Sequence, residues 1–141
     1  MKLNTKFHGI VEYNEEDVIT FKKGLPGFEN LRSFILIPVE ENNIFTILHS
    51  IEDDEVGLLL VSPFEAEPDY ELKLNDEKIN ELKIESQNEV LVLNTVTLRN
   101  NIKEITTNLK APIIINIKEK LGEQIILDNE KYCIKHPLFK E

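Results

Sequence analysis

The sequence has little cysteine and little arginine, and each shortage narrows the possible functions. Cys133 is the only cysteine among 141 residues, so there is no internal disulfide and no set of thiolates for a zinc or iron-sulfur site. We expect it to be an inert, semi-buried residue in a reducing compartment. Arg32 and Arg99 are the only arginines, so the side chain that binds phosphate in a bidentate manner is scarce. Direct binding of nucleic acid is therefore not expected.

Long apolar runs are also missing. Runs such as Val56 to Val61, interrupted by Gly57, have the length of one strand, whereas a membrane-spanning helix needs about 20 apolar residues. Residues 1–6 are not followed by an apolar stretch, so we expect no secretory signal. These features predict a soluble, cytoplasmic protein that does not bind membranes.

The overall composition is that of one compact domain. The chain is 41% hydrophobic and 30% charged, and a globular chain of this length buries roughly two thirds of its unfolded surface. No shift in composition indicates a linker, and no repeat is visible. We therefore expect a single domain over residues 1–141, without a cofactor or a structural metal.

The negative charge is concentrated in the middle of the chain. Residues 40–90 hold 15 acidic and 3 basic side chains, a net charge of −12 within a total of −10. Such a field repels phosphate backbones and attracts basic partners. The alternative is that the acidic residues only keep the protein soluble.

Short apolar runs separated by turn residues predict a mostly β chain. Ten strands are expected, at residues 7–13, 18–21, 33–39, 44–51, 56–61, 89–99, 105–109, 112–117, 124–127 and 132–134. Residues 14–17 would join the first two strands as a hairpin, and residues 118–123 and 128–131 are expected hairpin loops. Asp69 to Leu82 is the one expected short helix. A small, partly closed β-barrel is a natural way to hide so many strand edges.

Two local predictions concern the packing of one strand and the type of one turn. In the expected strand at residues 44–51, Phe45 and Ile47 share one face, which we expect to be the core face, and His49 is expected to be packed and hydrogen-bonded. Pro26 and Gly27 suit the second and third positions of a type II turn.

Catalytic signals are weak. His8, His49 and His136 lack the spacing of a helical zinc motif. Residues 52–55 lack the alternating ligands and the glycine of a calcium loop. Residues 24–27 are not followed by the Lys-Ser/Thr of a phosphate loop. A binding protein is favoured over an enzyme.

Several blocks together resemble the flagellar assembly factor FliW family. The blocks are Ile19-Thr20-Phe21, Gly24 to Glu29, Phe45 to Ser50, Val61-Ser62-Pro63, Asn94 to Leu98, Thr107 to Asn116, and Gln124 to Leu127 with Tyr132 and Pro137. They span nearly the whole chain in the family's order. The sequence departs from the family at His49, where glutamine is commoner, and at Lys22-Lys23, where a proline often precedes the glycine.

The resemblance implies a non-enzymatic β-barrel protein of flagellated bacteria with two protein partners. One is CsrA, a basic RNA-binding dimer that represses translation of flagellin messenger RNA, and the other is flagellin. In the implied circuit, unsecreted flagellin holds the factor; after flagellin export, the freed factor captures CsrA and translation resumes. The net charge of −12 in the middle segment agrees in sign with a basic partner.

Charge density alone suggests which residues contact CsrA. The hypothesis comprises eight acidic residues, Glu52, Asp53, Asp54, Glu55, Glu65, Glu67, Asp69 and Glu71. Flagellin is expected to offer an amphipathic helix to an apolar groove, and the free protein is expected to be a monomer. Two other functions stay open: a flavin-binding small-barrel enzyme and a general acidic chaperone or scaffold.

Overall fold

The computed structural model describes residues 1–6, 8–39 and 44–139. The strands are β1 Lys2–Thr5, β2 Gly9–Glu12, β3 Ile19–Thr20, β4 Ser33–Pro38, β5 Phe45–Ser50, β6 Gly57–Val61, β7 Val90–Thr97, β8 Thr106–Thr107, β9 Ile113–Asn116, β10 Leu121–Gln124 and β11 His136–Pro137. The helices are α1 Pro63–Ala66 and α2 Asp76–Glu81, with single 3-10 turns at Glu15–Asp17, Gln87–Glu89 and Ile102–Glu104. Within the described ranges, no helix has the length and apolarity needed to cross a bilayer.

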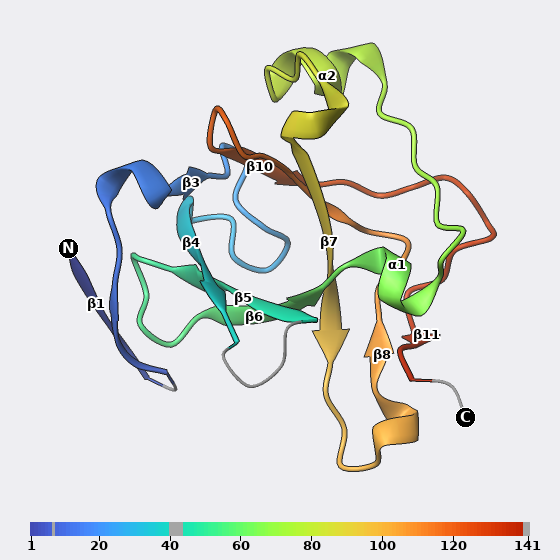
Figure 1. Ribbon diagram of the computed structural model, residues 1–141, viewed down its shortest axis with the longest axis horizontal. Coiled ribbons are helices and arrows are strands. Elements are labelled where there is room, and N and C mark those ends of the chain that lie inside the picture. Colours follow the sequence, from blue (N-terminus) through green and yellow to red (C-terminus); the bar gives the residue numbers. More distant parts are fainter. Residues whose placement is uncertain (7, 40–43, 140–141) are drawn as a thin grey trace.

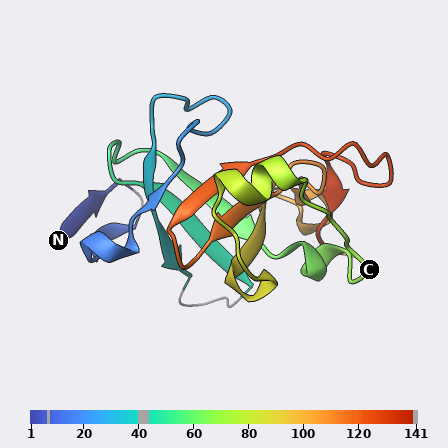
Figure 2. The ribbon, with the colours of Figure 1, turned by 90° about the horizontal axis from the view of Figure 1, so that it is seen from above.

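Seven strands close into a barrel, in the order β7-β6-β5-β4-β3-β10-β9 (Figures 1 and 2). Closure comes from β9, which pairs with β10 on one side and with β7 on the other. Neighbouring strands are antiparallel, except for the short parallel contact of Leu121 with Thr20. Closure removes the open edges of the sheet, and the expectation of a mostly β, barrel-like fold is confirmed.

The interior of the barrel is filled by apolar side chains from its strands and from the loop after β3. The central cluster comprises Ile19, Phe21, Leu25, Phe34, Leu48, Leu60, Leu93, Ile113 and Ile115. Phe21 and Phe34 pack edge to face with ring centroids 5.3 Å apart, a favourable aromatic geometry. Gly122 makes room for the Phe21 ring, because a Cβ there would lie 2.5 Å from it.

Phe45 and Ile47 of β5 pack or are buried against apolar residues, as predicted, but they do not face the interior of the barrel. Leu48, on the opposite face from Ile47, is the β5 residue in the central cluster. Ile47 is 8% exposed and lines a groove on the outside of the barrel, while Phe45 packs against a second cluster around Tyr70. Both faces of β5 are covered, so the period-two alternation of apolar residues did not identify the interior face.

The hairpin at the N-terminus differs from the predicted one. β1 pairs with β2, from Lys2 opposite Glu12 to Thr5 opposite Gly9, and β3 pairs instead with β4 and β10. Residues 14–17 are therefore not a hairpin turn. Asn14 caps the 3-10 turn Glu15–Asp17. Phe7, where the predicted first strand began, lies outside the described residues. Burial of Leu3 and Thr5 explains why the polar-looking segment at residues 2–5 forms a strand.

The helix expected over Asp69 to Leu82 is shorter than predicted. Only Asp76–Glu81 is helical, and the Asn75 side chain caps it by accepting a hydrogen bond from the Lys78 N–H at 2.8 Å. The segment before it is extended, with alternate residues Leu72 and Leu74 packed against the buried clusters. The helix α1 at Pro63–Ala66 was not predicted; Ser62 caps it and Pro63 occupies its first turn.

The C-terminal third also departs from the sequence prediction. β10 lies at Leu121–Gln124, so three of its residues fall in the expected loop 118–123 and only Gln124 falls in the predicted strand 124–127; residues 125–127 form no regular strand. Residues 132–134 form no strand; the last strand is His136–Pro137, which pairs with β8, so residues 128–131 are not a hairpin loop. Tyr132 is buried in the second cluster. The apolar pattern at residues 132–134 therefore reflects one aromatic core residue and not a strand.

Candidate functional site

The acidic loop at residues 52–55 joins β5 to β6, and part of its charge is used internally. One carboxylate oxygen of Glu52 accepts hydrogen bonds from the backbone N–H groups of Arg32 and Ser33, at 2.8 and 2.7 Å. Asp53 accepts a bond from the Glu55 N–H at 3.0 Å. Glu52 and Asp53 therefore hold the loop in place, whereas Asp54 and Glu55 are exposed acids whose carboxylates accept none of these backbone hydrogen bonds.

The loop also touches the hairpin formed by β1 and β2. The Lys6 N–H donates to the Asp54 carbonyl at 2.9 Å, and the Lys6 ammonium lies 3.2 Å from the Glu55 carboxylate. Both side chains of that ion pair are exposed, so the pair adds little stability. The contacts nevertheless place the acidic loop beside the hairpin.

The second acidic group surrounds α1. Glu65 lies in the helix, Glu67 follows it and accepts a bond from the Asp69 N–H at 3.2 Å, and the Glu71 N–H donates to the Tyr132 hydroxyl at 2.6 Å. The loop at residues 52–55 precedes β6 and this group follows it. The structure therefore separates the eight predicted residues into two surfaces, at opposite ends of one strand, and their role in binding stays a prediction.

An exposed aromatic residue marks the second surface. Phe64 is 55% exposed, and its ring packs edge to face on Tyr70, with centroids 6.2 Å apart. Tyr70 is itself fixed: its hydroxyl donates to the Leu109 carbonyl at 2.7 Å, and burial raises its pKa to about 12. A rigidly mounted, exposed ring among acidic residues has the features of a binding hot spot.

Sequence reasoning missed Phe64. We call the surface formed by Phe64, Glu65, Glu67 and Asp69 the α1 surface. The available signal was the Ser62-Pro63 pair, which is typical of a helix start and places the next residue on the first turn of a short exposed helix.

An apolar groove lies outside the barrel, between the hairpin and strands β4 to β6. It has a volume of about 730 Å³ and is lined by His8, Ile10, Val11, Ile37, Pro38, Val39, Ile47 and Leu59. Ile10 is 68% exposed. We call this the hairpin groove. Lys6, two residues before His8 of this groove, is bonded to Asp54, so the acidic loop lies beside the same hairpin.

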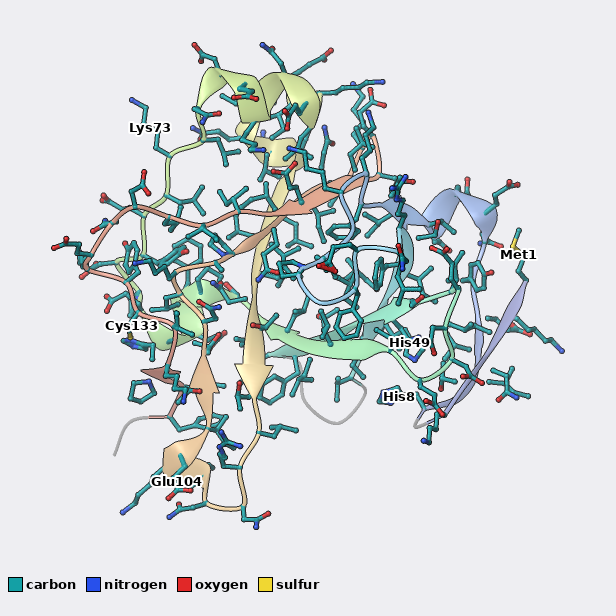
Figure 3. The ribbon with its side chains drawn as sticks, turned by 180° about the vertical axis from the view of Figure 1, so that it is seen from behind. Met1, His8, His49, Lys73, Glu104 and Cys133 are labelled. Carbon is teal, nitrogen blue, oxygen red and sulfur yellow. The ribbon has the colours of Figure 1, made fainter. Side chains whose placement is uncertain are left out.

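His49 is packed and hydrogen-bonded, as the sequence predicted. It is buried, its Nδ1 lies 2.7 Å from the Ser50 carbonyl, and its ring meets that of His8 edge to face at 6.1 Å (Figure 3). A Cβ at Gly57 would lie 2.8 Å from the His49 ring. His49 therefore acts in packing. Cys133, expected to be semi-buried, is exposed instead.

The sequence blocks that carried the family resemblance are explained by folding. Gly24 and Gly27 have φ of +66° and +86°, and the Phe28 N–H donates to the Leu25 carbonyl at 2.7 Å, which confirms the predicted turn. The Asn116 amide donates to the Leu82 and Lys83 carbonyls at 2.8 and 3.1 Å.

Asn108 organises the block at residues 107–116 in a similar way. Its side-chain oxygen accepts bonds from the N–H groups of Lys110 and Ala111, each at 3.1 Å, and its carbonyl accepts the Asn94 amide at 2.7 Å. These asparagines satisfy backbone groups, so the role of this block that the structure shows is in folding.

The closed barrel of short strands, with charged and apolar surfaces on its outside, defines a small β-barrel protein. The family model described as FliW protein matches residues 2–138. The chain belongs to the FliW family of flagellar assembly factors.

Similar proteins agree along the full length. The chain is 59% identical over 141 residues to the flagellar assembly factor FliW of Clostridium botulinum (strain 657 / Type Ba4), covering all of this chain and 99% of the relative. It is 62% identical to that of Clostridium novyi (strain NT), with the same coverage. A crystal structure of the flagellar assembly factor FliW superposes with a TM-score of 0.93 at 38% identity, covering 100% of this chain and 99% of that one.

Proposed function

We propose that this chain regulates flagellin synthesis by binding two proteins in turn: CsrA, a basic repressor of translation, and flagellin. The observation that carries the CsrA part is the net charge of −12 over residues 40–90, which includes the acidic loop and the α1 surface. A basic partner gains speed and selectivity of association from such a field. The proposed setting is the bacterial cytoplasm, and the proposed role is non-enzymatic.

The hairpin groove is the proposed flagellin site. An amphipathic helix buries its apolar stripe in a groove of this kind, and Ile10 and Ile37 supply apolar walls. Burial of a largely exposed isoleucine on binding contributes about 1 to 2 kcal/mol at roughly 25 cal/mol per Å².

The position of the two sites supports exchange of partners. The Lys6 backbone is bonded to Asp54, so a helix seated against the hairpin lies next to the acidic loop. CsrA and flagellin then compete for adjoining surface, and occupancy by unsecreted flagellin keeps the chain from CsrA. Release of flagellin exposes the acidic loop again.

Reversal of charge in the acidic loop is expected to slow CsrA association. Asp54→Lys with Glu55→Lys replaces the two acids that do not hold the loop, and should lower the association rate by about tenfold at low salt. The rate should also depend less steeply on ionic strength, because fewer charges are steered together. Stopped-flow measurement at several salt concentrations checks this.

The matched control reverses two other exposed acids, Glu15→Lys with Glu16→Lys, in the 3-10 turn after β2. It makes the same change in net charge at another place. If both double variants slowed CsrA association equally, the effect would come from net charge alone, and the acidic loop would not be part of the CsrA site.

A polar change in the hairpin groove is expected to affect flagellin selectively. Ile10→Asp places a charge where the proposed helix packs, and since Ile10 is exposed the fold should be retained. Flagellin affinity should fall at least tenfold, with CsrA affinity within about twofold of the unchanged chain. Calorimetric titration of each partner checks this; retained flagellin affinity would rule out the hairpin groove.

A further inference from the structure

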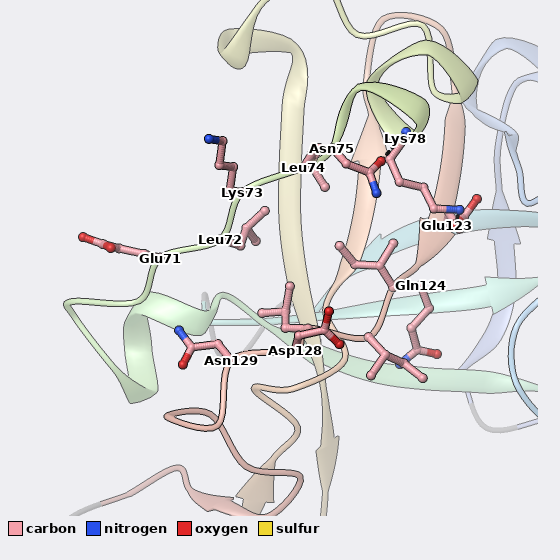
Figure 4. Close-up of a pocket in the computed structure, with 13 residues that line it drawn as sticks. Glu71, Leu72, Lys73, Leu74, Asn75, Lys78, Glu123, Gln124, Asp128 and Asn129 are labelled. Atoms are coloured by element: carbon pink, nitrogen blue, oxygen red, sulfur yellow. Dashed lines mark hydrogen bonds and ion pairs between the residues drawn. The ribbon is translucent and has the colours of Figure 1, made fainter.

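A second groove lies on another side of the molecule, between two extended segments that run in opposite chain directions (Figure 4). One wall is residues 71–75, before α2, and the other is residues 124–129, which begin at the last residue of β10. The groove has a volume of about 670 Å³, which is within the range of sites that hold ligands. An ion pair between Lys78 and Glu123 lies at its α2 end.

The wall at residues 124–129 presents a free strand edge. The N–H groups of Ile125 and Leu127 donate to the carbonyls of Pro112 and Lys110, at 3.0 and 2.7 Å. This alternating pattern is that of an antiparallel ladder, so the intervening N–H of Ile126 points the other way. Within the described part of the chain, the N–H and C=O groups of Ile126 and Asp128 have no hydrogen-bond partner.

The edge stays free because the neighbouring strand is short. β3 has two residues and meets β10 only where Thr20 is opposite Leu121. The edge therefore begins where β3 no longer covers it. Free strand edges are sites at which another chain can pair.

The opposite wall is also unpaired along its backbone. Among the described residues, no partner accepts the N–H groups of Leu72, Lys73 and Leu74. The side chains of Leu72 and Leu74 pack against the buried clusters, which fixes this wall in place. Both segments that line the groove thus carry unpaired backbone groups, and both are held in place, one by Leu72 and Leu74 and the other by the hydrogen bonds of Ile125 and Leu127.

These features select the kind of occupant. A helix satisfies its own backbone groups and leaves both walls unpaired, whereas an extended peptide supplies the missing donors and acceptors. Ile126 is 74% exposed and offers an apolar contact. Glu71 and Asp128 have no ion pair among the described residues, and with Lys73 they give the walls a net negative charge.

We propose that this groove binds an extended segment of another protein, in which apolar and basic residues alternate, by adding it as a strand along the edge at Ile126 and Asp128. The proposal goes beyond CsrA and flagellin binding because it assigns a mode of recognition to a surface that shares only Glu71 with the residues suggested for CsrA and none with the hairpin groove. It holds or fails independently of both partners.

The test uses a synthetic seven-residue peptide of alternating valine and lysine, capped at both ends, titrated into the full chain. Amide hydrogen exchange at Ile126 and Asp128, read by NMR, should slow at least tenfold at saturation, because free N–H groups become bonded. The same peptide with glutamate in place of lysine should bind at least tenfold more weakly. Absence of binding at millimolar peptide would overturn the proposal.

Main-chain pairing is tested separately. Two peptides, N-methylated at every valine or at every lysine, each lose the N–H groups of one edge. At least one should bind tenfold more weakly; equal binding of all three peptides would show that no strand is added. Ile126→Pro removes the free N–H and should weaken binding tenfold, while Ile126→Ala keeps it and should cost less than fivefold. If Ile126→Pro fails to fold, the methylated peptides still test whether the peptide pairs through its main chain.

Two other outcomes would also overturn the proposal. Peptide-induced shifts confined to Phe64 or to the acidic loop would place binding elsewhere. Sedimentation that shows a concentration-dependent dimer, lost in Ile126→Pro and unaffected by the peptide, would show that a second copy of this chain occupies the edge.

Discussion

Replacement of Phe64 by alanine is expected to weaken CsrA binding by about 2 kcal/mol, or roughly 30-fold. The ring is exposed, stands on the buried Tyr70 and is followed by three acids within five residues. Aromatic anchors of this kind dominate interface energies because they bury a large area with little loss of side-chain freedom. Calorimetric titration of CsrA into Phe64→Ala measures the loss.

Ile102→Ala is the matched control. Ile102 is exposed to a similar extent, 58%, and lies in the 3-10 turn before β8, away from α1. It should leave CsrA affinity unchanged. The thermal midpoint of both variants should stay near that of the unchanged chain, since neither side chain is buried. CsrA affinity retained within twofold in Phe64→Ala would exclude the α1 surface.

The largest expected effect on stability comes from Gly24. A Cβ at this position would lie 2.6 Å from the Glu29 Cα, and backbone cannot move aside as a flexible side chain can. The φ of +66° adds the cost of a left-handed conformation, about 1 to 2 kcal/mol for a residue with a side chain. Gly24→Ala should therefore lower the free energy of unfolding by about 3 kcal/mol. Denaturant titration measures it.

Gly27→Ala separates the two contributions. Gly27 has a positive φ of +86°, but a Cβ there would meet nothing within 4 Å. Its substitution should cost only the conformational part, about 1 kcal/mol. If Gly24→Ala and Gly27→Ala lowered the free energy of unfolding by the same amount, the close approach of a Cβ at Gly24 to Glu29 would contribute nothing. The structure described around the turn would then be wrong.

Much of the fold was predictable because strands and turns leave local signals. The apolar runs that became β4, β5, β6, β7 and β9 were found with small errors at their ends. The turn at residues 25–28 followed from Pro26 and Gly27. The barrel itself was inferred from the number of strands, since many short strands need closure to protect their edges.

Other elements depended on tertiary contacts that a sequence pattern does not contain. β1 is mostly polar, and only the burial of Leu3 and Thr5 against the rest of the protein makes it a strand. The face of β5 was ambiguous because the hairpin covers its outer side. Residues 70–75 have apolar spacing that suits a helix, yet Leu72 and Leu74 pack with the period of an extended segment.

The candidate site was predicted only as a concentration of charge. Counting acids could not reveal that Glu52 and Asp53 hold their own loop. The separation of this loop from α1 was implied by the strand predicted at residues 56–61, which is β6 in the structure. Phe64, the hairpin groove and the free edge at Ile126 arise from exposure and from missing backbone partners, which become visible only when the chain is folded.

A competition titration tests the central claim most directly, namely that this chain exchanges one protein partner for another. Labelled CsrA is bound to the purified chain and flagellin is added. The account predicts that each partner binds alone and that flagellin displaces CsrA completely, with an apparent CsrA affinity that falls in proportion to flagellin concentration. A stable ternary complex, or absence of binding by either protein, would contradict it.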